Sequence, residues 1–399
     1  MGNNIPQGYK ATALGIIPQE WEVMRLGDIV SITSGESPSL YHLKAEGKYP
    51  YVKVEDLNNC EKYQESSREY SDDNNTTIKA GSIIFPKRGA SILNNKVRIA
   101  AKDIQMDSNM MAITPHTTIV DTEFLYIRIL HERLYRIADT SSIPQINNKH
   151  IIPYKIAVPP LAEQRKIAEV LGVWDEAIEK QARLIEKLAL RKRGLMQRLL
   201  SAKLRLPGFS EPWKIHKLQE LFTERNETNR TDLPLLSITG DRGVILQTES
   251  EKRDTSNDDK SKYKRIAKGD IGYNTMRMWQ GRSALSGLEG IVSPAYTIVV
   301  PNTDVDGYYM SVLFKQPRLI YDFWTHSQGL VGDTLNCKYR DFGQVHICCP
   351  PLAEQKAITE VLTAADREIE LAKEKLERLR RQKRGLMQQL LTGKKRVKY

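Results

Sequence analysis

Cysteine is scarce in this sequence of 399 residues, which contains only Cys60, Cys337, Cys348 and Cys349. None of the four has the C-x-x-C spacing of a zinc site, and together they form no plausible disulfide framework. We therefore interpret them as reduced and structural. Long apolar runs are also absent, because no stretch approaches the roughly 20 residues that a membrane-spanning helix needs, and residues 1–7 are polar. We expect no membrane association and a cytoplasmic location.

Motifs of the common DNA-modifying enzymes are missing as well. A P-loop would read G-x-x-x-x-G-K-[ST], of which LTGKK (391–395) contains only a fragment. An amino-methyltransferase needs a glycine-rich cofactor loop and an N-P-P-Y type turn, whereas both Pro-Pro pairs here are followed by Leu-Ala-Glu. A magnesium nuclease needs clustered carboxylates near a lysine, but the Glu-x-Lys matches are those expected by chance and the seven histidines form no ligand pair. We therefore predict no catalytic residue and no metal site.

Positive charge is in excess, with a formal net charge of +11. Lysine and arginine neutralise phosphates and release their counterions, so this excess favours a polyanionic partner, although a merely solvated basic surface fits the charge alone equally well. The 40% hydrophobic and 27% charged fractions are typical of a globular protein. The length suggests two or three domains.

A repeat organises the chain. Residues 159–171 (PPLAEQRKIAEVL) match residues 350–362 (PPLAEQKAITEVL), an offset of 191 positions. The same offset aligns KRGLMQRLL at 192–200 with KRGLMQQLL at 383–391. Two copies of one unit are therefore present.

Each repeated segment has the heptad periodicity of a long amphipathic helix. Proline suits the first turn of a helix, so both helices should begin after the Pro-Pro pairs. A helix of about 38 residues is a rod of roughly 57 Å. It needs a partner, which could be its repeat in the same chain, another subunit or both; a domain-core helix is the alternative. The residues expected to pack along the helices are Ile167, Leu171, Trp174, Ile178, Ile185, Leu188, Ile358, Leu362, Ile369, Leu376 and Leu379.

Gly194 and Gly385 occupy matched positions inside the two helical patterns. Glycine in a helix interior costs about 1 kcal/mol relative to alanine. Its recurrence favours a close approach of helix backbones at both positions, so we include the two glycines among the helix-packing residues. A bend or an early helix end is the alternative.

A globular region precedes each helix. Looser similarity between residues 18–32 and 211–224, and between 80–89 and 268–281, extends the repeat upstream. Short β-type runs alternate with helical patterns, so both globules are predicted to be α+β. If the helices pair as an antiparallel coiled coil, the globules lie at opposite ends about a pseudo-twofold axis. The predicted domains are 1–158, 159–203 (first long helix), 204–349 and 350–399 (second long helix and a basic tail, expected to be solvated).

These residues carry a family resemblance. PPLAEQ entering a long helix twice, GYKATALGIIPQEWEVMRLGDI (8–29), and GIVSPAYTIVVP (290–301) after TMRMWQG (275–281) together resemble the specificity (S) subunit of type I restriction-modification enzymes over essentially the whole chain. The resemblance implies two target-recognition domains that each read half of a split site in double-stranded DNA. It also implies two methylation (M) subunits docked on the helices, with restriction (R) subunits joining them. S-adenosylmethionine, ATP and magnesium would belong to those partners.

Base reading requires Arg, Lys, Asn or Gln on exposed loops, because their donors and acceptors match base edges in the major groove. Four loop clusters have this composition, and solvated turns are the alternative interpretation for each. A further series, residues 260–268, is basic and could touch phosphates. The candidates in the first globule are Lys87, Arg88, Asn94, Asn95, Lys96, Gln145, Asn147, Asn148 and Lys149. Those in the second globule are Arg277, Trp279, Gln280, Arg282, Lys338 and Arg340.

The two globules share little sequence outside the repeated framework, so we predict that they read different half-sites and that the whole target is asymmetric. Two other functions compete with this hypothesis. A self-contained nuclease or methyltransferase with unrecognised motifs would show activity alone. A bridging protein with a coiled coil would lack the salt-sensitive DNA affinity of a phosphate-contacting protein.

Overall fold

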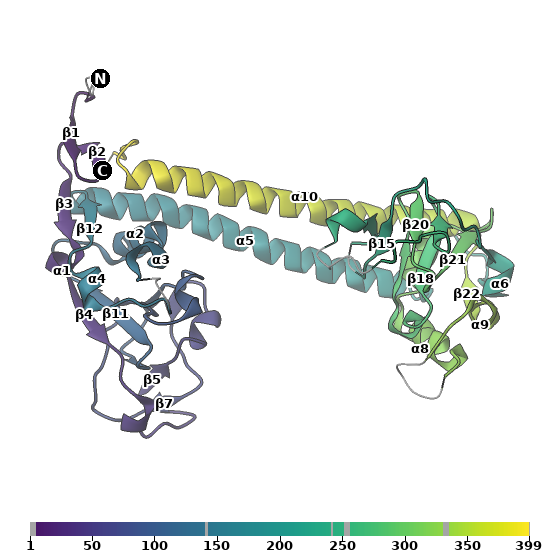
Figure 1. Cartoon of the computed structure of the whole chain (residues 1–399), viewed down its shortest axis with the longest axis horizontal. Coiled ribbons are helices and arrows are strands. Elements are labelled where there is room, and N and C mark those ends of the chain that lie inside the picture. Colours follow the sequence, from purple (N-terminus) through teal and green to yellow (C-terminus); the bar gives the residue numbers. More distant parts are fainter. Residues whose placement is uncertain (1–4, 140–142, 241, 251–255, 330–334, 399) are drawn as a thin grey trace. The chain divides into compact units, whose positions relative to one another are not determined.

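The computed structural model describes residues 5–139, 143–240, 242–250, 256–329 and 335–398. The chain forms two compact units (Figure 1). Unit 1 comprises Met1–Ala182 and Glu374–Tyr399, and unit 2 comprises Arg183–Lys373. Each unit contains one α+β globular domain and a part of both long helices, which confirms the predicted fold class.

Unit 1 is built on a five-stranded sheet in the order β4-β11-β8-β9-β6. Its central strands are buried on both faces: Phe85 and Ile113 point into one apolar cluster together with helix α2, while Ile84 and Ala112 point into a second. This alternation follows from the two-residue period of a strand. The strands are β1 (Tyr9–Thr12), β2 (Gly15–Pro18), β3 (Glu22–Arg25), β4 (Val30–Ser34), β5 (Tyr49–Val52), β6 (Tyr63–Gln64), β7 (Tyr70–Ser71), β8 (Ile83–Pro86), β9 (Arg98–Ala100), β10 (Gln105–Met106), β11 (Met110–Pro115) and β12 (Lys155–Val158). The short helices are α1 (Leu26–Ile29), α2 (Thr122–Glu132), α3 (Leu134–Ile137) and α4 (Asn148–Ile151).

Unit 2 repeats this plan with a four-stranded sheet in the order β14-β21-β18-β19. Tyr273 and Val299 face the larger apolar cluster, and Ile298 faces a smaller one. The strands are β13 (Lys214–Lys217), β14 (Phe222–Glu224), β15 (Leu236–Ile238), β16 (Val244–Leu246), β17 (Lys264–Ile266), β18 (Ile271–Asn274), β19 (Ser283–Leu285), β20 (Gly290–Val292), β21 (Tyr296–Pro301) and β22 (His346–Cys349). The short helices are α6 (Leu218–Leu221), α7 (Gly307–Leu313), α8 (Pro317–His326) and α9 (Tyr339–Gln344), with a 3-10 turn η5 (Met278–Gln280).

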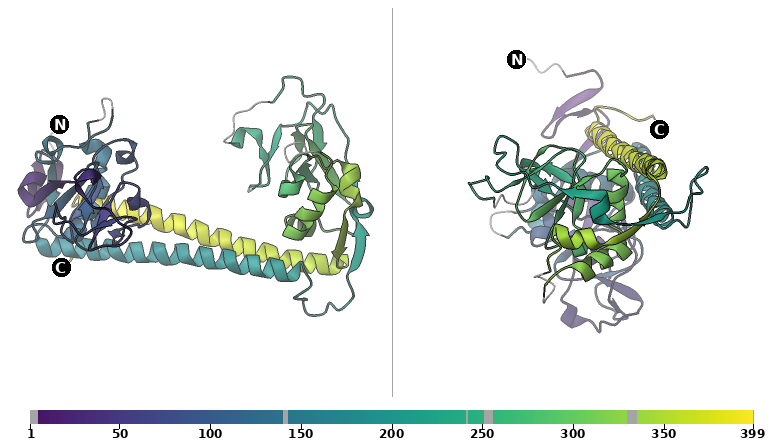
Figure 2. Two further views of the ribbon diagram at one scale, coloured as in Figure 1. Left: turned by 90° about the horizontal axis from the view of Figure 1, so that it is seen from below. Right: turned by 90° about the vertical axis from the view of Figure 1, so that its right-hand side faces the viewer.

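The two long helices are α5 (Leu161–Leu199) and α10 (Leu352–Leu391), and both begin directly after the Pro-Pro pairs, as predicted. Within each unit their parts run side by side in opposite directions (Figures 1 and 2). In unit 1 Asp175 pairs with Lys383. In unit 2 Arg191 pairs with Glu368 and Lys192 with Asp366. Oppositely charged side chains of the two antiparallel helices therefore form ion pairs within each unit.

The predicted helix-packing residues are buried or half-buried, with two exceptions. Ile167 and Leu171 belong to the core of the unit 1 globule, and Ile358 and Leu362 occupy the same place in unit 2. The start of each helix is thus a domain-core helix, and the rest forms the helix pair. The exceptions are Gly194 and Gly385, which are exposed and would have nothing within 4 Å of an added Cβ. Their assignment as helix-packing residues was wrong, because a close approach would leave no such space.

The PPLAEQ motif joins each globule to its helix. The Glu163 carboxylate is fully buried and accepts hydrogen bonds from Trp21 Nε1 (2.9 Å) and Arg396 Nε (2.6 Å). In unit 2 the buried Glu354 accepts them from Trp213 Nε1 (3.2 Å) and Arg205 Nε (2.7 Å). A buried carboxylate requires such partners, so the motif's glutamate holds the junction together.

The glutamine of the motif makes a second junction. Gln164 Nε2 donates to Pro159 O (2.8 Å), and its Oε1 accepts from the backbone N–H of Asp121 (2.8 Å), the N-cap residue of α2. Gln355 makes the matching bonds to Pro350 O and the N–H of Asp306 in unit 2, both at 2.9 Å. The side chain therefore fixes the start of one helix against the start of another.

The basic tail was expected to be solvated, and this is wrong for Arg396. Its guanidinium binds Glu163 and also Glu20 (2.7 Å). The carbonyl of Gly393 accepts a hydrogen bond from the Tyr9 hydroxyl (3.0 Å). Residues Gly393 and Arg396 thus pack into unit 1, where Arg396 supplies the cation that pairs with Glu163.

Candidate nucleic-acid interface

In unit 1 the structure brings the two predicted loop clusters together. Arg88 and Gln145 form an isolated antiparallel bridge. Ile146 N donates to Lys87 O (2.8 Å), and Gly89 N donates to Pro144 O (2.8 Å). The loop after β8 therefore lies along the segment that leads into α4. We call this composite surface reading face 1, made of residues 87–96 and 145–149.

Unit 2 repeats the arrangement. Cys337 N donates to Thr275 O (2.8 Å), which places the loop after β18 beside the segment that leads into α9. The equivalent surface, reading face 2, is made of residues 275–282 and 337–340. The two predicted clusters of the second globule are thus also neighbours.

Within reading face 1 the predicted residues differ in their freedom to contact a ligand. Arg88, Asn94 and Lys149 are exposed, as are Asn147 and Asn148. Asn95 instead joins α2 to α3 inside the domain: its Nδ2 donates to the carbonyl of residue 130 (3.0 Å), and its Oδ1 accepts from the N–H of residue 134 (2.9 Å). It adopts a positive φ of 50°. Its side chain is therefore engaged in structure.

Two of the three lysines of reading face 1, Lys87 and Lys96, are half-buried. Lys96 Nζ donates to Asn58 Oδ1 (2.6 Å). Burial, together with the neighbouring Arg88, lowers the pKa of Lys87. An anion bound beside Lys87 would raise this pKa again, because it would stabilise the charged form of the side chain.

In reading face 2, Arg277, Gln280 and Arg282 are exposed on or beside η5. Trp279 is half-buried and donates its indole N–H to Met276 O (3.0 Å). The ring is therefore oriented by the turn itself, while Met278 is fully buried beneath it. Lys338 and Arg340, at the start of α9, are exposed.

All cations of the two faces except Lys96 lack side-chain partners within the described part of the chain. Seven of them make no ion pair and no side-chain hydrogen bond there: Lys87, Arg88, Lys149, Arg277, Arg282, Lys338 and Arg340. By contrast, Arg265 of the basic series at 260–268 binds Glu227 (2.7 Å) and Glu289 (2.5 Å). Unpaired guanidinium and ammonium groups gathered on a surface are available to phosphates and base edges.

Sequence reasoning missed two aromatic residues on α8. Tyr321 and Trp324 are 60% and 47% exposed, with ring centroids 5.6 Å apart. Helix α8 lies against the η5 turn, where the side chain of Ile320 would be 3.0 Å from a Cβ at Gly281. The sequence could have indicated their exposure. Leu319 and Phe323, four residues apart, form the buried face of α8, and Tyr321 and Trp324 do not lie on that face.

The described residues contain no group of three or more His, Cys, Asp or Glu side chains that could hold a metal ion. Among them there is likewise no helix long and apolar enough to cross a membrane. The two reading faces offer exposed cations and amide groups for recognition.

Comparison with known proteins agrees with these features. Residues 18–189 match the family model of the type I restriction modification DNA specificity domain. The type I restriction enzyme MjaVIII specificity subunit of Methanocaldococcus jannaschii is 25% identical over 96% of this chain and 94% of its own length. The fold resembles the crystal structure of a type I restriction-modification S subunit from M. genitalium, with a TM-score of 0.54, 16% identity, and coverage of 98% of this chain and 97% of that one. It also resembles a chain from a study of complex assembly and conformational transition of the type I R-M system, with a TM-score of 0.62, 18% identity, and coverage of 94% and 99%.

Proposed function

Since this chain belongs to the specificity subunits of type I restriction-modification enzymes, which are non-catalytic, we propose that reading faces 1 and 2 each recognise one half of a split, asymmetric DNA target. The observation that supports this most strongly is the repeated pairing of loops. In both units the same backbone contact joins two distant segments into one surface, at Ile146–Lys87 and at Cys337–Thr275. Each surface carries unpaired cations, which DNA requires.

The composition of the two faces supports an asymmetric target. Reading face 1 presents several asparagine side chains, whose amides pair with adenine, beside Arg88. Reading face 2 presents Arg277 and Arg282 with Gln280, and arginine pairs most readily with guanine. Different donor sets at equivalent places read different bases.

The long helices are proposed to dock two methylation subunits, with restriction subunits joining the complex. Support comes from apolar side chains exposed on the helices, Val173 in unit 1 and Leu184, Leu190 and Leu371 in unit 2, which a protein partner would cover. S-adenosylmethionine, ATP and magnesium are assigned to these partners. In this proposal the protein acts in the cytoplasm, where the DNA is.

Mapping of methylated adenines tests the proposal. The chain is co-expressed with its methylation subunit in a host that lacks other adenine methylation. A second strain carries a chimera in which residues 1–158 come from another family member. The proposal predicts one split motif, of which the chimera changes one half only.

Two results would contradict the proposal. Methylation that does not depend on this chain would remove its role in recognition. A short continuous motif would rule out two separate reading faces and would favour the bridging-protein hypothesis. The matched control is the reciprocal chimera of residues 204–349, which should change only the other half.

A further inference from the structure

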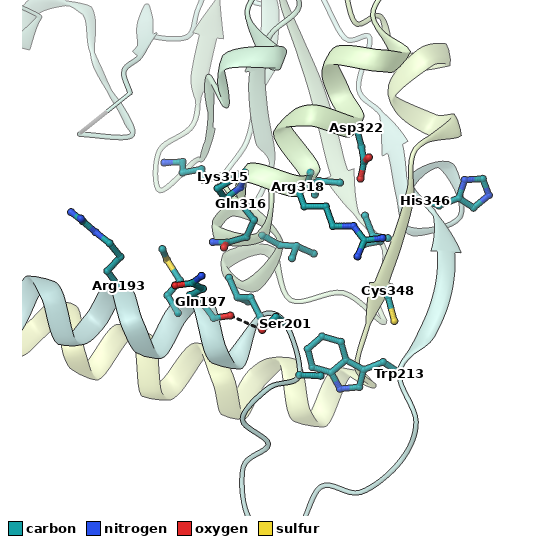
Figure 3. Close-up of a pocket in the computed structure, with 17 residues that line it drawn as sticks. Arg193, Gln197, Ser201, Trp213, Lys315, Gln316, Arg318, Asp322, His346 and Cys348 are labelled. Carbon is teal, nitrogen blue, oxygen red and sulfur yellow. Dashed lines mark hydrogen bonds between the residues drawn. The ribbon is translucent and has the colours of Figure 1, made fainter.

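Unit 2 contains a cavity of about 830 Å³ that DNA recognition does not use. It lies between the C-terminal part of α5, strand β22 and the segment from α7 to α8 (Figure 3). Its apolar wall includes Met196, Leu200, Trp213, Leu313 and Ile347. The volume and the apolar lining are those of small-molecule sites in proteins.

The charged groups of the cavity are mostly cationic. Arg193, Lys315 and Arg318 line it, and within the described chain none of them makes an ion pair or a side-chain hydrogen bond. Asp322 is the one carboxylate among the lining residues. In Figure 3 Arg318 extends from α8 toward Cys348, whereas Arg193 stands at the edge on α5.

Two further features mark the place where an anion would bind. Burial, together with the nearby Lys192, lowers the pKa of Lys315. The side-chain nitrogen of Gln316 is buried and has no hydrogen-bond partner. A buried donor without a partner is rare in folded proteins and commonly indicates a missing ligand or water.

In unit 1 the matching helix position carries a cation instead of an apolar side chain. The seventh residue after the N-cap aspartate is Arg128 in α2 and Leu313 in α7. Arg128 Nη1 donates to Leu391 O (2.6 Å) at the end of α10, and Arg128 Nη2 pairs with Glu132 (2.6 Å). Leucine replaces this guanidinium in unit 2, at a place that lines the cavity.

We propose that the cavity of unit 2 binds an organic anion with an apolar body. The acidic group lies beside Lys315 and the amide of Gln316, and the body packs on Leu313 and Ile347. This site goes beyond DNA recognition, since no base or phosphate needs the apolar wall. Lys315 also lines a second cavity, of about 640 Å³, together with Gln280 and Arg282 of reading face 2, so the anion would sit next to the proposed DNA contacts.

The test measures binding of 8-anilinonaphthalene-1-sulfonate, an aromatic apolar anion, to the full chain by titration calorimetry. The proposal predicts one site per chain. Leu313→Glu, which places a carboxylate on the apolar wall and repels the acidic group, should weaken binding at least tenfold, and so should the double change Lys315→Gln with Gln316→Ala. Lys187→Gln is the control, because Lys187 is an exposed cation on α5 that does not line the cavity.

Competition between the dye and two twelve-carbon compounds shows how much the acidic group and the apolar body each contribute to binding. Dodecanoate should displace the dye, and dodecanol should do so at least tenfold less well. The proposal is overturned if the dye does not bind, or if it binds the unchanged chain, the two cavity variants and the Lys187→Gln control equally. It is also overturned if dodecanol competes as well as dodecanoate. Circular dichroism of each variant shows whether it is folded; if Leu313→Glu unfolds the chain, the double change decides.

Discussion

Removing the guanidinium of Arg396 should destabilise unit 1 selectively. Arg396→Ala leaves the fully buried Glu163 carboxylate without its cation, while the Trp21 indole still donates to it. Breaking a buried ion pair costs about 3–5 kcal/mol. Because the Arg396 side chain is 31% exposed, solvent screens part of this loss, and we expect about 2–3 kcal/mol. For a unit of this size the melting temperature should fall by about 4–12 °C.

Amide hydrogen exchange of the full chain, read by mass spectrometry, locates the effect. In Arg396→Ala, protection should fall in β3 and β12, while β13 and β22 keep theirs. Arg205→Ala is the matched variant, because Arg205 binds Glu354 in the same way; it should show the reverse pattern. Equal loss in both units, or no loss in either variant, would refute the reasoning from the buried carboxylates.

Three other predictions follow from exposure and burial. Arg282→Ala should weaken discrimination in one half-site by about 1–3 kcal/mol in competition binding by the assembled methyltransferase, and an equal loss in both halves would contradict the assignment. Gly194→Ala and Gly385→Ala should each raise the free energy of unfolding in urea by up to about 1 kcal/mol, because both positions are exposed and open; a decrease would reveal a close contact. Burial raises the pKa of Cys337 to about 12, so its thiolate is negligible at about pH 8, and a thiol reagent should label the exposed Cys348 first; equal labelling rates would contradict the burial.

The helices could be predicted from the sequence because their burial follows a local period. Leu188 and Leu376 are both buried at heptad positions. The prediction for Gly194 and Gly385 was wrong because it rested on their recurrence at matched positions. The heptad pattern itself is formed by apolar side chains. A glycine carries no side chain that could reveal whether its face is buried.

The reading faces could be predicted only in part. Loop composition pointed to Arg88 and Gln145 separately, but their pairing joins residues far apart in the chain. Nothing in a local pattern encodes that contact. Asn95 has the residue type of a base reader, yet its amide is used between α2 and α3. A sequence does not show whether a polar side chain forms hydrogen bonds with the backbone or is free to bind a ligand.

The repeat also hides a difference in chain order between the two junctions. In unit 2, Arg205 and Trp213 follow α5 in one continuous segment and meet Glu354. In unit 1 the matching pair, Arg396 and Trp21, lies at opposite ends of the chain. Unit 2 is therefore complete within residues 183–373, whereas unit 1 needs the last residues of the chain to satisfy Glu163. Since a buried carboxylate without a cation is costly, the first globule to be synthesised is the last to acquire its full set of contacts.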